Sequence, residues 1–196
     1  MSQAAREPAT VADLLALPES GRAFELIDGV IEPRGAACGR HGAAQCRLGC
    51  ILEPFDRRPS GHAPGGFWLA LAVDISFDPQ NTLRPDLVGW RRDRVSQRPK
   101  DRVVSVRPDW VCEILSTNRR TDLIAKKRIY HRHEVPHYWI IDPDEETLTV
   151  NRWTREGYLE VLVGERGDAV RAEPFEAIEI RIDTLFGDDD EENEGG

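Results

Sequence analysis

An acidic residue, Glu113, interrupts the apolar run at residues 110–115 (WVCEIL). The run has the length and composition of a buried strand, and a buried carboxylate without a partner costs several kcal/mol. A second acid, Asp86, stands at the start of another predicted strand, in "PDLVGW". If the two strands are neighbours, both carboxylates can share a hard cation through oxygen ligands, which suits Mg²⁺ or Mn²⁺.

Lys126 is the third unusual charge, because it falls within the apolar stripe of a helix predicted over residues 122–132. The stripe consists of Leu123, Ala125, Ile129 and Tyr130. Lys127 lies at its edge, whereas Lys126 is aimed at the core and also needs an anion. Two carboxylates, a metal ion and an ammonium form an arrangement suited to phosphodiester hydrolysis. The alternative for each acid is a salt bridge to a nearby arginine.

The rest of the chain alternates helical and strand patterns. Thr10 caps a short helix that ends before Pro18, and residues 24–33 alternate around Asp28-Gly29, which predicts a hairpin. Helical spacing predicts a second helix over residues 41–55, before a Pro/Gly-rich loop. Strands are predicted at residues 67–77, 84–90, 108–115, 137–142, 147–153 and 158–164, the last two as an antiparallel ribbon. The pattern is that of an α/β protein.

Length and charge distribution indicate one domain with a tail. No linker divides residues 1–187, so we expect a single domain there. Residues 188–196 contain six acids and no base, and this composition predicts a disordered acidic tail. Without these six acids the formal charge of −9 becomes −3. A nearly neutral body binds a polyanion only through local basic clusters.

Two basic clusters flank the acidic candidates. The first contains Arg91, Arg92, Arg94, Arg98, Lys100, Arg102 and Arg107, and the second contains Arg119, Arg120, Lys126, Lys127, Arg128 and Arg132. Either cluster could contact phosphates or could simply be a solvated face.

The chain contains no apolar stretch near the ~20 residues that a membrane helix needs and no secretion signal, so we expect no membrane contact and a cytoplasmic location. Four cysteines in a chain with its own core indicate reduced thiols. The group Cys38, His41, Cys46 and Cys50 could bind zinc, but small apolar cysteines in a helix explain it as well.

Several segments resemble the Uma-two restriction-endonuclease family of the PD-(D/E)XK nuclease superfamily. They cover nearly the whole body: "FELIDGVIEP", His41 at the start of a helix, "LRPDLVGW", "PDWVCEILS" and "RRTDLIAKKRIYHRHEVPHYWIIDP". The resemblance implies a restriction-endonuclease-like α/β core, with a central mixed sheet flanked by helices and a C-terminal antiparallel ribbon. It also implies a DNA endonuclease that depends on Mg²⁺ or Mn²⁺.

The resemblance assigns roles to single residues. Asp86 and Glu113 correspond to the metal ligands, and Lys126 and Glu25 complete the catalytic set. The family's lysine follows an aspartate by four positions, which selects Lys126 after Asp122. His41 matches a family position and could orient the substrate, although a structural role at the helix start is the alternative.

The chain departs from the superfamily pattern at one position. The usual lysine stands two residues after the acid, and the residue two positions after Glu113 is Leu115 here. The family is thought to take its lysine from the following helix. The competing hypothesis is a binding or regulatory module that keeps the nuclease fold without turnover. Asp142 is interpreted as a turn former and Asp122 as a helix cap.

Nucleases that cut both strands commonly act as symmetric pairs, so we expect a homodimer. The aromatic residues Trp153 and Tyr158 of the C-terminal ribbon could form the contact between its subunits. Packing within the sheet is the alternative explanation for both rings.

Overall fold

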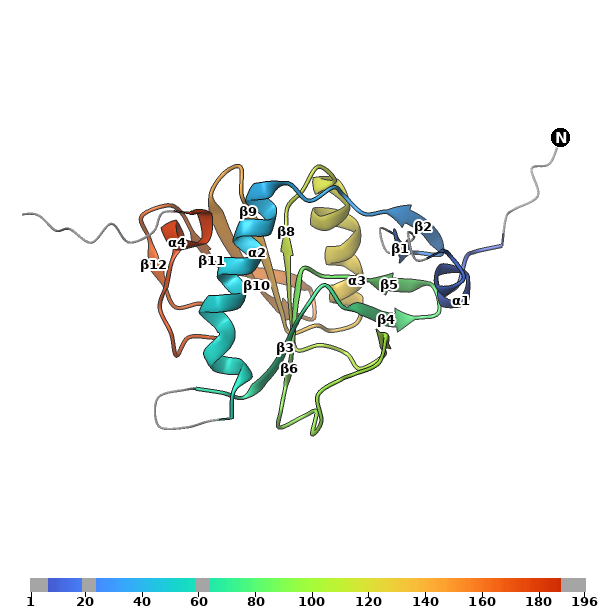
Figure 1. Ribbon diagram of the computed structural model, residues 1–196, viewed down its shortest axis with the longest axis horizontal. Helices are drawn as coiled ribbons and strands as arrows, with labels where there is room; N and C mark the ends of the chain where they lie inside the picture. The colour runs from blue at the N-terminus through green and yellow to red at the C-terminus, as the bar shows by residue number, and fades with distance from the viewer. Residues whose placement is uncertain (1–6, 19–23, 59–63, 188–196) are drawn as a thin grey trace, which may run out of the picture.

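The computed structural model describes residues 7–18, 24–58 and 64–187 (Figure 1). The acidic tail, residues 188–196, lies outside the described residues. The helices are α1 (Val11–Leu15), α2 (Gly39–Leu52), the 3-10 helix η2 (Glu53–Asp56), the π-helix η3 (Thr121–Lys126), α3 (Lys127–Arg132) and α4 (Ile182–Phe186).

A six-stranded sheet forms the centre of the molecule, in the order β11-β10-β9-β8-β6-β3. Its strands are β3 (Phe67–Leu71), β6 (Leu87–Arg91), β8 (Trp110–Ile114), β9 (His137–Asp142), β10 (Thr147–Thr154) and β11 (Gly157–Gly164). β8 and β9 are parallel and the other neighbours are antiparallel, so the sheet is mixed. The predicted C-terminal ribbon is β10 with β11.

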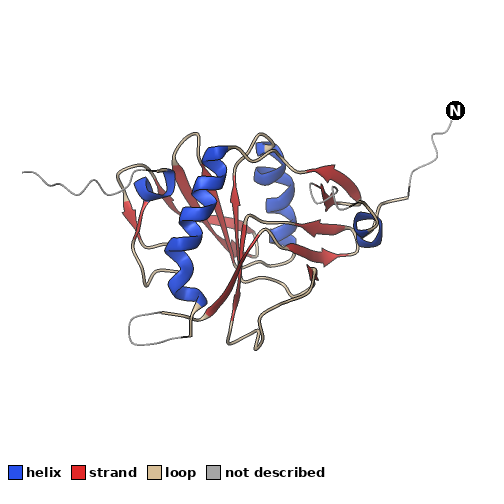
Figure 2. Ribbon diagram, in the orientation of Figure 1, coloured by secondary structure: helices blue, strands red, loops and turns tan. Residues whose placement is uncertain are grey.

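A five-stranded sheet, in the order β2-β1-β5-β4-β7, lies to one side next to α1 (Figure 2). Its strands are β1 (Phe24–Ile27), β2 (Val30–Pro33), β4 (Asp74–Asp78), β5 (Asn81–Leu83) and β7 (Val103–Val104). Two short strands, β12 (Ala169–Val170) and β13 (Ile180–Arg181), pair near the C-terminus.

The core lies on both faces of β8, because its side chains alternate. Trp110, Cys112 and Ile114 pack in the apolar cluster that contains α2 and α4. Val111 packs on the opposite face, in the cluster that contains α3 and the five-stranded sheet. Helices on both faces of a mixed sheet confirm the predicted α/β class.

The local turn and cap predictions at the N-terminal end are confirmed. Thr10 caps α1 and exchanges hydrogen bonds with Asp13 in a capping box. β1 and β2 form the predicted hairpin, and Asp28 and Gly29 take positive φ values of 47° and 76°. A two-residue turn of this kind matches the twist of the two strands.

Two predicted elements differ from the structure. The single strand predicted over residues 67–77 is two strands, β3 and β4, which belong to different sheets. The chain leaves one sheet for the other near Ala72, whose φ is 49°. The predicted helix after Asp122 exists, but its first part is a π-helix, and Leu123 is exposed although the helical wheel placed it in the apolar stripe.

Arginines of the first basic cluster secure the outer edge of β3. The Leu69 N–H donates to Asp56 Oδ1 at 3.0 Å, and the Leu69 carbonyl accepts from Arg98 Nη1 at 2.8 Å. Arg98 also pairs with the Asp56 carboxylate, and Arg92 donates to the Phe67 carbonyl.

Other arginines of the two clusters are paired as well. Arg94 binds Asp109, Arg119 binds Asp142, and both Arg128 and Arg132 contact Asp28. These intramolecular pairs favour the structural interpretation of both clusters.

The ribbon aromatics have partners within the chain. Trp153 Nε1 donates to the His131 carbonyl at 2.9 Å, and the two rings stack. The Tyr158 hydroxyl donates to the Val135 carbonyl at 2.8 Å. Packing within the chain therefore accounts for both rings. The homodimer stays a prediction, but these two rings no longer support it. Among the described residues, no helix is long and apolar enough to cross a membrane.

A pair of leucine substitutions tests the arrangement of the core. Leu48 on α2 is 0% exposed and Leu71 at the end of β3 is 52% exposed. Leu48→Ala is expected to lower the free energy of unfolding by about 2–5 kcal/mol, because it leaves a cavity. Leu71→Ala, the control, is expected to change it by about 0.5 kcal/mol or less. Urea denaturation measures both, and equal losses would contradict the assignment of α2 to the core.

Candidate active site

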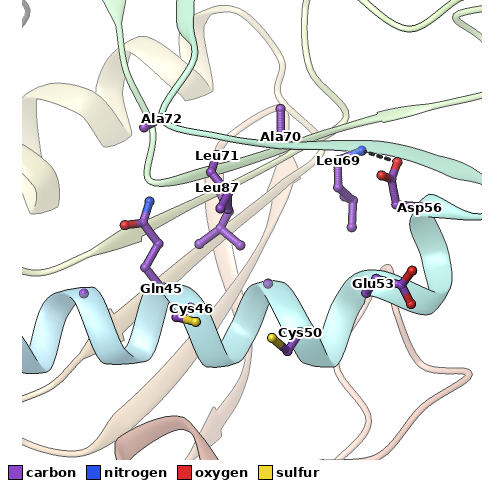
Figure 3. Close-up of a pocket in the computed structure, with 12 residues that line it drawn as sticks. Gln45, Cys46, Cys50, Glu53, Asp56, Leu69, Ala70, Leu71, Ala72 and Leu87 are labelled. Atoms are coloured by element: carbon purple, nitrogen blue, oxygen red, sulfur yellow. Dashed lines mark hydrogen bonds between the residues drawn. The ribbon is translucent and has the colours of Figure 1, made fainter.

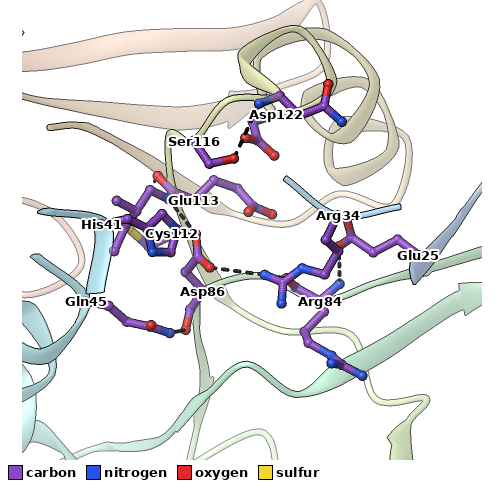
Figure 4. Close-up of polar contacts among 12 residues, drawn as sticks. Glu25, Arg34, His41, Gln45, Arg84, Asp86, Cys112, Glu113, Ser116 and Asp122 are labelled. Carbon is purple, nitrogen blue, oxygen red and sulfur yellow. Dashed lines mark hydrogen bonds and ion pairs between the residues drawn. The ribbon is translucent and has the colours of Figure 1, made fainter. Parts of the chain in front are cut away.

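The structure brings the predicted site residues together from four elements. Glu25 lies on β1, Asp86 precedes β6, Glu113 lies on β8 and Lys126 ends η3, and all four side chains are buried. β6 pairs with β8, and Leu87 faces Cys112, which confirms that the strands of Asp86 and Glu113 are neighbours. Figure 4 shows Asp86 between the side chains of Arg34 and Gln45, with Glu25 and Glu113 nearby.

Lys126 lies at the centre of this group. Its Nζ atom is 3.1 Å from Glu25 Oε2, 3.1 Å from Glu113 Oε2 and 3.1 Å from Asp122 Oδ1. The burial of the lysine would lower its pKa, but Glu113, Glu25 and Asp122 together raise it well above the usual range. Lys126 is therefore a permanent ammonium ion.

The side-chain alternation of β8 explains why this charge comes from a helix. Glu113 shares its face of the strand with Val111 and Leu115, and both of these pack in the apolar cluster beneath α3. Leu115, at the usual lysine position, is therefore part of the core. Lys126 approaches the same face from η3 above it and reaches Glu113 from there.

Asp86 is fixed by three donors. Its Oδ2 atom accepts the Ile114 N–H at 2.8 Å and lies 3.2 Å from His41 Nε2, while Oδ1 accepts Arg34 Nη2 at 3.1 Å. Burial would raise the pKa of Asp86, but the contacts with His41 and the Ile114 N–H lower it below the usual value. The carboxylate is ionised and oriented.

Glu113 is held by two groups. Its Oε2 atom accepts from Lys126 at 3.1 Å, and Oε1 accepts the hydroxyl of Tyr130 on α3. Burial raises the pKa of Glu113 well above its usual value, although Lys126 opposes this shift, and burial also raises the pKa of Asp122. Both acids therefore need more positive charge than they have to stay ionised.

The charges of the site do not balance. Four carboxylates, those of Glu25, Asp86, Glu113 and Asp122, surround two permanent cations, Lys126 and Arg34. Such a surplus of oxygen ligands fits a hard divalent cation. Within the described residues no three acidic side chains form a ready metal cage, because Lys126 occupies the space between three of them.

The comparisons with known proteins agree with this geometry. The family model Uma2, described as "Putative restriction endonuclease", matches residues 11–184. The chain belongs to the Uma2 family. A search of curated proteins gives no match.

The fold of this Uma2 chain is similar to a crystal structure described as a putative nuclease belonging to DUF820 from Anabaena variabilis ATCC 29413. The TM-score is 0.70 at 25% sequence identity, and the match covers 91% of this chain and 98% of the other. The likeness confirms the predicted nuclease-like fold.

Three residues of the Uma2 site were not predicted as members of it: Asp122, Tyr130 and Arg34. The prediction that Asp122 caps its helix is wrong, because Arg120 holds the cap position and Asp122 pairs with Lys126. The spacing of four residues between Asp122 and Lys126 could have predicted this pair, because residues four apart are neighbours on a helix surface. The interpretation of Asp142 as a turn former is confirmed, since it accepts the backbone N–H groups of Asp144 and Glu145.

The four zinc candidates do not converge. His41 is buried against Asp86, whereas Cys46 and Cys50 line a groove between α2 and β3 (Figure 3). Cys38 is exposed at the start of α2. Since His41 faces away from the groove, the cysteines lack the partner that the zinc interpretation required.

Removing the central charge tests this account of the site. Lys126→Met leaves three buried carboxylates without their counter-ion, and we expect it to lower the free energy of unfolding at pH 7 by about 3–5 kcal/mol. A buried carboxylate whose pKa is higher in the folded than in the unfolded protein lowers the free energy of unfolding at any pH above both pKa values. This loss of stability disappears as the pH falls through the pKa of the folded state, because the carboxylate becomes protonated. The deficit relative to wild type should therefore shrink as the pH is lowered from 7 toward the folded pKa values of these acids.

Lys127→Met is the matched control, because Lys127 is the next residue and, within the part of the chain that the structure describes, donates only to Asn151 Oδ1, at 3.2 Å. Its loss should cost about 1 kcal/mol or less without a pH dependence. Urea denaturation at several pH values measures both variants. Equal stability of the two variants at pH 7 would show that Lys126 does not hold the site together.

Proposed function

We propose that this Uma2 protein is a metal-dependent endonuclease that hydrolyses phosphodiester bonds in DNA. The observation that carries the proposal is the buried surplus of carboxylates around Lys126 and Arg34. A protein does not bury four acids against two bases for stability alone, since unpaired buried charge is costly. Membership of a family described as restriction endonucleases supports the reaction class.

Asp86 and Glu113 would hold the cation, Mg²⁺ or Mn²⁺, because Asp86 directly precedes β6, Glu113 lies on the paired strand β8, and both present oxygen ligands. A bound cation of this kind supplies an activated water and neutralises charge on the phosphate. His41 and the Ile114 N–H orient Asp86 for this role, and Tyr130 orients Glu113.

Lys126 acts as an electrostatic group in this proposal. Its raised pKa keeps the ammonium protonated at neutral pH, so it cannot serve as a general base. Its contacts favour the ionised forms of Glu113 and Asp122. Glu25 is also fixed from the other side, since its Oε1 atom accepts the Arg84 N–H at 2.6 Å.

A binding module without turnover is the second candidate function. The observation that favours it is that Lys126 already contacts three carboxylates, while Leu115 fills the usual lysine position. Such a module would bind DNA without cutting it. It would also show no stabilisation by Mg²⁺, because its acids would be neutralised within the chain.

Metal binding separates the two candidates. We expect Mn²⁺ to bind wild-type protein in a calorimetric titration, and Mg²⁺ at about 100 times its Kd to raise the melting temperature by about 5–10 °C. Glu113→Gln should abolish the titration heat and the nicking of plasmid DNA. Glu160→Gln, on an exposed position of β11, is the control and should behave as wild type.

Three outcomes are distinguishable in that experiment. Binding and nicking that disappear together in Glu113→Gln support the endonuclease. Metal binding in wild type without nicking of plasmid, linear or single-stranded DNA would contradict the nuclease activity but not the assignment of Asp86 and Glu113 as metal ligands. An absence of metal binding in wild type would contradict that assignment and favour the binding module.

The homodimer is part of the proposal, because a symmetric pair of sites suits the two strands of a duplex. Light scattering of the purified protein tests it. A monomeric mass in the presence of DNA and metal would remove the dimer from the proposal without affecting the site.

A further inference from the structure

The two cations of the site, Lys126 and Arg34, differ in how many of their N–H donors already have a partner. An ammonium has three N–H donors, and Lys126 Nζ lies within 3.1 Å of three different carboxylates. Its side chain is only 4% exposed. A substrate phosphate could reach Lys126 only by displacing one of these acids.

Arg34 still has free donors. Its Nη2 atom donates to Asp86 Oδ1 and to the Arg84 carbonyl, both at 3.1 Å. Within the described part of the chain, Nε and Nη1 of Arg34 form no hydrogen bond. The side chain is 23% exposed, so this cation connects the buried acids with solvent.

The charge of Arg34 is maintained by the site itself. Burial would lower its pKa, but Glu25, Asp86 and Glu113 together raise it above the usual value. A guanidinium also forms charge-assisted hydrogen bonds to phosphate oxygens. Arg34 therefore combines a permanent charge, unused donors and access.

The backbone after Arg34 holds it over the site. Gly35 lies against the loop that follows β8, and a Cβ atom at this position would be 2.1 Å from Ser116 Oγ and 3.2 Å from Asn118 Cβ. Only glycine allows this approach. The segment that carries Arg34 is thus fixed against the loop that leads away from Glu113.

We propose that Arg34 is the residue of this site that binds the substrate phosphate. One of its free groups, Nε or Nη1, donates to a phosphate oxygen while Nη2 keeps its bond to Asp86. The proposal rests on the proposed nuclease function and gives the phosphate contact to Arg34, not to Lys126. Lys126 then serves as the counter-ion of the buried carboxylates and does not touch the substrate.

Cleavage kinetics of a labelled duplex in Mg²⁺ test the proposal. Arg34→Gln should lower kcat about 100-fold, as expected for loss of a donor to developing charge, and Arg34→Lys should recover part of the loss. Arg57→Gln is the control, because Arg57 is exposed and, among the described residues, pairs only with Glu53 at the far end of α2. A kcat for Arg34→Gln within twofold of wild type, with Glu113→Gln inactive, would overturn the proposal.

Duplex binding in Ca²⁺, followed by fluorescence anisotropy, adds a measurement that a purely structural role would not change. Losing one phosphate contact should weaken binding of Arg34→Gln about tenfold and reduce the slope of log K against log salt concentration by about 1. Melting temperatures confirm that the variant is folded.

The two measurements separate the two proposals. If wild type cleaves no DNA, the proposed nuclease function fails, and binding alone decides the role of Arg34. Weaker binding of Arg34→Gln with a smaller salt slope then supports the phosphate contact. Equal affinity of Arg34→Gln and wild type, or no binding by wild type, overturns it.

Discussion

The ammonium of Lys126 binds three carboxylates that come from three separate parts of the chain. Glu25 belongs to the five-stranded sheet, Glu113 to the six-stranded sheet and Asp122 to the helix between β8 and β9. A buried charge is tolerated only while its partners stay in place. The same contacts that prepare the site therefore also set how the two sheets and the helix lie against one another.

The acids that could be predicted from the sequence are those that interrupt an apolar pattern. Asp86 stands out directly before the apolar strand β6 and Glu113 within β8, whereas the pairing of these two strands was only a condition of the prediction and is observed in the structure. Lys126 stands out in a helical stripe for the same reason. Arg34 could not be found in this way, because it lies in an irregular segment after β2, where no periodicity shows which side chains face inward.

The errors in the fold have a related cause. Residues 67–73 form an unbroken apolar run that continues into the pattern of residues 73–77, and only the positive φ of Ala72, a residue type that rarely adopts it, divides them between two sheets. The helical wheel assumed α-helical spacing, whereas η3 is a π-helix. Lys126 was still placed correctly, because its carboxylate partners hold it inward, while the apolar Leu123 has no such partners.

The secured edge of β3 affects how this protein behaves at high concentration. An edge strand normally offers free N–H and carbonyl groups to a strand of another molecule. At Leu69 both groups are already bound by Asp56 and Arg98, and the Phe67 carbonyl is bound by Arg92. The apolar groove beside this strand can therefore stay open to solvent without starting a growing intermolecular sheet, so these ion pairs protect the solubility of the protein as much as its shape.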